Sequence, residues 1–330
     1  CPLFSPLGSI VCHTISMKNT HLEHPEDNIL NNGKEGAKTV LKFFQEKNSK
    51  LSVKYDGSPA IVWGRNPEND KFFVGTKSVF NKVKVKINYT HHDIELNHGH
   101  TPEVASILHM CLVSFQNYSN MGVFQSDFIG FAGTNEYNPN TITYKFDKEI
   151  DSDKHNIVVA THSHYVGDEM KSMDCVFNTE YTFCGKAYNL NTNAELVHRH
   201  LQVGLWVNVA KTLIPFVKFP DIKEGKKIKQ VVNQFIRERR ELTANALAKE
   251  TGFSANLFHL YNIIREIKLL LMTGINPEDS TVECYIGDEI GGHEGYVMSN
   301  VHGTYKLIDR QYFSYANFTV GRQRKMSDSK

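Results

Sequence analysis

Cysteine is scarce in this sequence, and its spacing matches no familiar site. The chain of 330 residues has six cysteines, and none belongs to a Cys-x-x-Cys pair. This spacing argues against a zinc ribbon and against a disulfide framework. We therefore expect reduced thiols, the usual state inside a cell.

Long apolar runs and an excess of one charge are also missing. No apolar segment approaches the roughly 20 residues that a membrane span needs, so we expect no membrane partner. The first residues lack the basic start and apolar core of a signal peptide, which favours a cytoplasmic protein. The formal net charge is only +1, so any nucleic-acid surface must be a local patch.

Aromatic residues, by contrast, are plentiful, and 20 Phe and 14 Tyr suit a β-rich core. Hydrophobic periodicity predicts helices at 34–47, 102–118, about 191–214, 226–242 and 254–271. It predicts strands at 52–54, 60–63, 71–80, 82–87, 121–131, 141–146, 156–161, 181–183, 281–286, 295–299 and 303–309. We infer an α+β fold in which a helical insertion at about 190–275 interrupts a domain of residues 1–190 and 275–320. Residues 321–330 are expected to form a flexible tail.

The most informative stretch is Leu51–Gly64, where two β-rich segments flank the polar turn Asp56-Gly57. Lys54 ends the first segment, beside a carboxylate and a glycine, so its side chain can face a cleft. A lysine that attacks phosphorus must lose its proton, although its ordinary pKa is about 10.4. Burial or a nearby cation lowers that pKa. The alternative interpretation is a surface lysine beside a hairpin turn.

Lys54-Tyr-Asp-Gly57 resembles motif I of the covalent nucleotidyltransferases, the superfamily of ATP-dependent RNA and DNA ligases and mRNA capping enzymes. Further segments resemble the later motifs, in the family's order. They are Gly75–Val79 with Lys77, Phe124–Gly130 with Asp127 (motif III), Asn138–Tyr144, Glu294-Gly-Tyr-Val297 (motif IV), and Tyr305–Tyr312 with Lys306 (motif V). With Ser58 after motif I, the pattern is most similar to phage T4 RNA ligase 1-like enzymes.

The resemblance implies a fold, a reaction and a set of site residues. The fold would be an antiparallel-sheet nucleotidyltransferase (adenylation) domain. ATP would adenylylate Lys54, and AMP would then pass to a 5′-phosphate end for joining to a 3′-OH. Lys54 and Lys306 would be catalytic, and the metal Mg²⁺ or Mn²⁺ would bind Asp127 and Glu294. The nucleotide-binding residues would be Val53, Asp56, Gly57, Lys77, Asp127, Glu294, Lys306 and Arg310.

Motif V departs from the family pattern of two lysines two residues apart. Alignment on Tyr312 makes Lys306 the first lysine and places Ile308 at the second. Arg310 could substitute for the missing lysine. Alternatively, Lys306 is the second lysine and Thr304 stands at the first position.

Two other functions stay open. One is a GTP-dependent guanylyltransferase of the capping type. The other is a non-catalytic relative that binds nucleotide or nucleic acid. His21–Asp27, Asp56–Ala60 and Gly75–Phe80 also resemble an uncharacterised group of proteins from large tailed phages, which implies a phage- or virus-encoded protein in the host cytoplasm.

The expected nucleic-acid partner is RNA or a single-stranded end. The basic run from Lys226 to Arg240, on a predicted helix, is the best candidate surface for it. A solvated helix face is the alternative. Several histidine pairs, including His162 and His164, could share a face for zinc, but no third ligand has suitable spacing.

Overall fold

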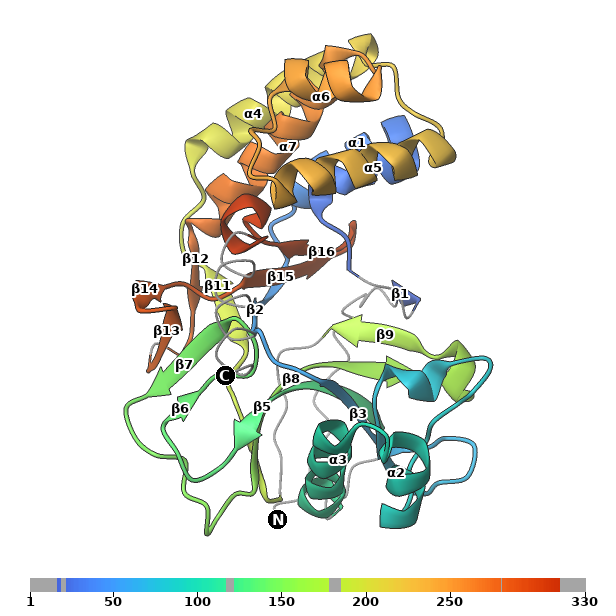
Figure 1. The fold of residues 1–330 in the computed structure, drawn as a ribbon. Coiled ribbons are helices and arrows are strands. Elements are labelled where there is room, and N and C mark those ends of the chain that lie inside the picture. Colours follow the sequence, from blue (N-terminus) through green and yellow to red (C-terminus); the bar gives the residue numbers. More distant parts are fainter. Residues whose placement is uncertain (1–16, 19–21, 117–121, 178–184, 280, 315–330) are drawn as a thin grey trace, which may run out of the picture.

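The computed structural model describes residues 17–18, 22–116, 122–177, 185–279 and 281–314. The expected tail at 321–330 and the expected strand at 181–183 lie outside these residues. Within the described part, three mainly antiparallel sheets and two groups of helices form the predicted α+β architecture (Figure 1).

Sheet A has seven strands, and all its pairings are antiparallel except that of β10 with β8. In spatial order its strands are β1 (Met17–Lys18), β9 (Asp174–Phe177), β8 (Ile157–Val166), β5 (Val123–Phe131), β3 (Ala60–Arg65) and β4 (Phe72–Gly75), with β10 (Ala187–Asn189) beside β8. Helices α2 (His91–His98) and α3 (Pro102–Phe115) cover one face. There Trp63 stacks on Phe115 with ring centroids 4.0 Å apart.

Sheet B has five strands and packs against the larger group of helices. Its order is β12 (Ile275–Pro277), β11 (Asn193–Leu196), β2 (Lys50–Lys54), β15 (Gly295–Asn300) and β16 (Gly303–Leu307). The helices are α1 (Asn28–Gln45), α4 (Leu201–Leu213), α5 (Ile222–Arg237), α6 (Ala244–Thr251) and α7 (Ala255–Met272). Leu51, Met298 and Leu307 belong to the same hydrophobic cluster as the buried faces of these helices.

Sheet C has four strands, in the order β14 (Glu289–Gly291), β13 (Val282–Ile286), β7 (Ile142–Phe146) and β6 (Glu136–Tyr137). Figure 1 shows the helices that pack on sheet B at one end of the molecule and α2 and α3 at the other, with the sheets between them. Sheets A and B therefore each turn one face to helices and keep the other face for the interior of the molecule.

The link between β2 and β3 is the first important difference from expectation. Asp56-Gly57 is a typical hairpin signal, but β2 and β3 do not pair with each other. β2 pairs with β11 and β15 in sheet B, and β3 pairs with β4 and β5 in sheet A. The hairpin interpretation was wrong, because long-range pairing overrides the local turn signal. The turn instead carries the chain from one sheet to the other, directly after Lys54.

Two predicted elements were also wrong. The segment 191–214 is not one helix, since β11 occupies Asn193–Leu196 and α4 begins only at Leu201. The alternating segment 82–87 is not a strand: Val83 and Val85 are exposed, and Lys84 has φ +54. In addition, α1 shares a core with α4–α7, so the helical block (α1 and α4–α7) draws on two separate parts of the sequence.

Candidate active site

A cavity of about 300 Å³ lies where sheets A and B face each other. Five of the side chains expected from the motifs line it, although they come from five distant parts of the sequence: Lys54, Lys77, Asp127, Glu294 and Lys306. Val53 lines it as well. The fold thus brings together the residues that carried the resemblance.

Strand register explains how Lys54 and Lys306 come to face the same cavity. Lys54 on β2 lies opposite Gly295 on β15, and Lys306 on β16 lies opposite Val297. Val297 in turn lies opposite Ser52. Side chains two residues apart on a strand share a face, so Ser52 and Lys54 point to the same side. Both lysines therefore project from one face of sheet B.

Lys54 forms an ion pair with Glu294, which directly precedes β15. Burial alone would lower the pKa of Lys54, but Glu294 and then Asp127 outweigh this effect and raise it. Burial raises the pKa of Glu294, with Lys54 opposing the shift. Lys54 is therefore protonated in this arrangement, contrary to the expectation of a lowered pKa, because two carboxylates face it. Its proton already has an acceptor in hydrogen-bond contact.

Lys306 shows the shift expected of a cation in a crowded cationic site. Burial lowers its pKa, and the charges of Lys54 and Arg310 lower it further. Lys77 begins the short 3₁₀ helix η2 (Lys77–Phe80) just after β4, rather than lying on a strand. It is exposed and lines the cavity. Two amines besides Lys54 can thus meet an anionic ligand.

Asp56 does not line the cavity but holds together two of the motifs. Its buried carboxylate accepts hydrogen bonds from Asn140 Nδ2 (2.9 Å) and from the backbone N–H groups of Thr141 (2.8 Å) and Ile142 (3.2 Å). Its own N–H donates to the Tyr144 hydroxyl at 2.6 Å. We therefore correct its expected role as a nucleotide ligand. Its hydrogen bonds instead hold motif I against the segment 138–144.

Two motif glycines are needed because other segments of the same chain pack closely against their backbone. A Cβ on Gly57 would lie 2.7 Å from Cβ of Asp127 and 2.8 Å from the Phe128 carbonyl oxygen. Gly295 has φ +154, and a Cβ there would lie 2.2 Å from the Leu307 carbonyl oxygen. Gly57 therefore acts by letting the lysine turn pack on the strand of Asp127, not by touching a ligand. Gly295 likewise allows the segment that carries Glu294 to pack closely on β16.

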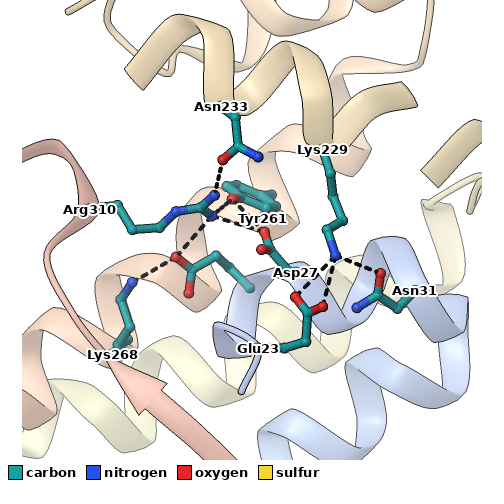
Figure 2. Close-up of polar contacts among 9 residues, drawn as sticks. Glu23, Asp27, Asn31, Lys229, Asn233, Tyr261, Lys268 and Arg310 are labelled. Atoms are coloured by element: carbon teal, nitrogen blue, oxygen red, sulfur yellow. Dashed lines mark hydrogen bonds and ion pairs between the residues drawn. The ribbon is translucent and has the colours of Figure 1, made fainter. Parts of the chain in front are cut away.

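The structure gives no second lysine for motif V. Ile308 is buried in the core beside sheet C. Arg310 does not line the cavity: it donates to Asp27 Oδ1 (3.0 Å), the Tyr261 hydroxyl (2.9 Å) and Asn233 Oδ1 (2.5 Å) (Figure 2). The expectation that Arg310 binds nucleotide is corrected, because both of its Nη atoms bind other side chains outside the cavity.

Several polar residues on the sheet A wall were not predicted for this site, and His162 was expected only as a possible zinc partner of His164. His162 Nε2 lies 3.6 Å from Asp127 Oδ2, and its ring stacks on Phe177. The hydroxyl of Tyr165 donates to Gln125 Oε1 at 2.5 Å. The predicted strand ended at residue 161, whereas β8 continues to Val166. The polar run Thr161–His164 inside an otherwise apolar segment was the available signal.

Cys175 is the one cysteine among the residues that line the cavity. Burial raises the pKa of its thiol, and it is the thiolate that attacks. Burial therefore disfavours the thiolate of Cys175.

The donor set suits a hard cation only in part. In the described portion of the chain, no group of three or more His, Cys, Asp or Glu side chains is arranged to hold a metal ion. Mg²⁺, however, is usually held by one or two carboxylates together with phosphate and water. Asp127 and Glu294 fit that role, because both carboxylates face the same cavity.

Most of the expected basic run lies on α5, and Arg239 and Arg240 follow the end of that helix. Lys223, Lys226, Lys227, Arg237 and Arg239 are exposed, whereas Val232 and Phe235 pack into the core. Arg240 is partly neutralised by Glu238 and Glu250, at 3.5 Å and 3.4 Å. Within the described residues, no helix is both long and apolar enough to cross a membrane.

Fold and site together define an α+β protein with a lysine- and carboxylate-lined cavity between two antiparallel sheets. Residues 19–252 and 242–322 match DUF6267, a family of unknown function. These ranges cover most of the chain, so the protein belongs to that family. No curated protein and no solved structure matches it.

Proposed function

We propose that the protein is an ATP-dependent ligase-like nucleotidyltransferase with Lys54 as its nucleophile. The convergence of Lys54, Lys77, Asp127, Glu294 and Lys306 on one cavity supports this proposal most directly. Unrelated surface residues would have no reason to meet there. Three amines beside two carboxylates is also a donor set that suits a nucleoside triphosphate.

In the proposed first step, Lys54 Nζ attacks the α-phosphorus of ATP. A P–N bond forms, the bond between the α-phosphorus and the bridging oxygen breaks, and pyrophosphate leaves. Because Lys54 is protonated, it first gives one proton to Glu294, which already accepts a hydrogen bond from it and whose pKa burial raises. The second proton leaves the nitrogen as the P–N bond forms and departs with pyrophosphate. Lys306 stabilises the charge that develops on the phosphoryl oxygens.

A Mg²⁺ or Mn²⁺ ion at Asp127 and Glu294 would neutralise phosphate charge. The second step would transfer AMP from Lys54 to a 5′-phosphate end, with cleavage of the P–N bond. In the third, a 3′-OH would attack that phosphate and AMP would leave. The exposed lysines and arginines of α5 would hold the RNA or single-stranded acceptor through its phosphates.

Covalent labelling tests the proposal. The protein is incubated with α-labelled ATP or GTP and Mg²⁺ or Mn²⁺, then run on a denaturing gel. We expect label from ATP that is lost in Lys54→Ala and kept in Lys50→Ala, an exposed lysine at the start of the same strand. Label from GTP alone would favour the capping reaction. No label from either nucleotide would exclude both enzymes.

One observation favours a second candidate, a nucleotide-binding protein that transfers nothing. Ile308 lies in the core and Arg310 is engaged elsewhere, so motif V brings only Lys306 to the cavity. Nucleotide binding with no covalent label, measured by calorimetry on the same preparation, would favour this candidate.

A further inference from the structure

The backbone around Lys306 is anchored at two points, and both lead to the helical block. The N–H of Lys306 itself donates to the Glu23 carbonyl oxygen at 3.1 Å. Four residues later, Arg310 binds Asp27 as well as Asn233 of α5 and Tyr261 of α7. The segment that carries the lysine is therefore tied to helices outside the cavity.

Lys229 on α5 fixes the first of these anchors. Its Nζ lies 3.1 Å and 3.0 Å from the two carboxylate oxygens of Glu23, and 3.2 Å from Asn31 Oδ1. Figure 2 shows Lys229 pointing from its helix toward Glu23 and Asn31. The residue before Glu23, Leu22, lines the cavity. One lysine thus connects α5 to the wall of the site.

Lys229 differs in this from the other basic residues of its helix. Lys223, Lys226 and Lys227 are exposed, whereas the Lys229 side chain is 22% exposed and meets three acceptor atoms. A residue that gripped nucleic-acid phosphates would be free to reach solvent. The geometry of Lys229 suits support from within the protein.

Beneath this contact, a buried ion pair stiffens the same segment. Lys268 of α7 donates to Glu26 at 2.7 Å, and the two side chains are 1% and 0% exposed. Glu26 and Asp27 belong to the 3₁₀ helix η1 (Pro25–Asp27), which follows Glu23 and His24 directly. The segment that contacts Lys306 is thus held from both α5 and α7.

We propose that Lys229 is a positioning residue for Lys306. It fixes Glu23, and the Glu23 carbonyl fixes β16 at Lys306, so the helical block sets the geometry of the cavity. This inference rests on the proposed role of Lys306 in nucleotidyl transfer. Arg310 supplies the second anchor.

The test compares Lys229→Met, Lys229→Arg and the control Lys249→Met, which changes an exposed lysine on α6 in the same helical block. Single-turnover labelling gives a rate at saturating ATP and a half-saturating concentration. We expect Lys229→Met to lower the saturated rate by roughly tenfold with little change in half-saturation, since small misplacement of a catalytic group is costly. Lys229→Arg should recover most of that rate, because a guanidinium can also meet both oxygens of Glu23.

A second measurement, the apparent pKa of Lys306, does not depend on catalysis. Competitive acetylation across pH, followed by mass spectrometry, reports the apparent pKa of Lys306. In Lys229→Met we expect it to move toward the ordinary value of 10.5, with no change in Lys249→Met. Failure of the wild type to label would refute the proposed function, and the acetylation profile would still decide the positioning role.

The inference is overturned if Lys229→Met labels at the wild-type rate, or if Lys306 acetylates identically in all variants. A slow rate that Lys229→Arg does not restore would also count against it. If Lys229→Met does not fold, the labelling rate of Glu23→Gln decides, because this variant weakens the same contact from its other end.

Discussion

Among single residues, Asp56 allows the clearest separation of a structural from a ligand-binding role. Replacing it with Ala leaves Asn140 and two backbone N–H groups without their acceptor. The two backbone N–H groups, of Thr141 and Ile142, are buried, and a buried unpaired group costs about 1–3 kcal/mol, so we expect Asp56→Ala to lower the free energy of unfolding by about 3 kcal/mol in urea titrations. Asp56→Asn, which keeps one oxygen, should lose less. Unchanged stability with weakened nucleotide binding would restore Asp56 as a ligand.

Gly57 gives a second prediction at this scale. An added methyl group in Gly57→Ala would collide with Asp127 and push the turn away from β5. We expect labelling of Lys54 to fall by at least tenfold, since displaced catalytic groups lose rate steeply. Gly292→Ala is the matched control, because its Cβ would meet nothing within 4 Å. Equal labelling by the two variants would contradict the proposed packing role.

At the scale of elements, the contact between η1 and α7 depends on the buried pair Glu26–Lys268. Breaking one side leaves an uncompensated buried charge, which typically costs about 3–5 kcal/mol. We expect Glu26→Gln and Lys268→Met each to destabilise by that amount. The double variant should recover much of the loss, because it buries neither charge. Fully additive losses in urea titrations would show that the two groups do not compensate each other.

His24, just before η1, predicts how stability depends on pH. Burial, and then the charges of Arg310 and Lys268, hold its pKa well below 6.5. The unfolded chain therefore takes up the proton first as pH falls below about 6.5, so stability declines through that range. Each unit by which folding lowers the pKa of His24 corresponds to about 1.4 kcal/mol in the free energy of unfolding.

Urea titrations at pH 7.5 and 5.5 check this sign. We expect His24→Gln to lose less stability over that interval than the wild type. His92→Gln, which changes an exposed histidine, should follow the wild type. The same loss in all three proteins would rule out His24 as the titrating group.

Local sequence patterns predicted some elements well. They failed where pairing with strands distant in the sequence determines the structure. Ser254 caps α7, as expected from its position before an amphipathic run. The alternation of charged and apolar residues at 82–87 wrongly predicted a strand, because those residues do not pair with any described sheet. Likewise, the turn at Asp56 looked like a hairpin, and only pairing of β2 with β15 and of β3 with β5 separates its two strands.

At the scale of the whole molecule, motif order predicted which residues share the cavity, but not which way each side chain points. Lys54, Asp127, Glu294 and Lys306 do line it, whereas Asp56 and Arg310 are turned into the protein interior. The direction of Arg310 depends on helices α5 and α7, which no motif describes. His162 was expected only in a zinc pair with His164, and its place beside Asp127 was not predicted, because β8 runs five residues beyond its predicted end.

The charge on α5 predicts how the whole protein meets nucleic acid. If α5 binds RNA as proposed, Lys226→Gln, Lys227→Gln and Arg237→Gln together remove three phosphate contacts and should weaken binding of single-stranded RNA. It should also reduce the slope of log affinity against log salt by about 2, at roughly 0.7 for each contact. A matched triple variant of exposed lysines elsewhere, at Lys148, Lys154 and Lys171, should bind as the wild type does. Equal slopes in both variants would remove α5 as the nucleic-acid surface.

The central claim is that Lys54 forms a covalent bond to a nucleotide. Protein incubated with ATP and Mg²⁺ is digested under conditions that preserve phosphoramidates, and its peptides are mapped by mass spectrometry. We predict the added mass of one AMP on the peptide that contains Lys54, on that lysine alone, and its removal by added pyrophosphate. An unmodified Lys54, or AMP on another residue such as Lys306 or Lys77, would contradict the account.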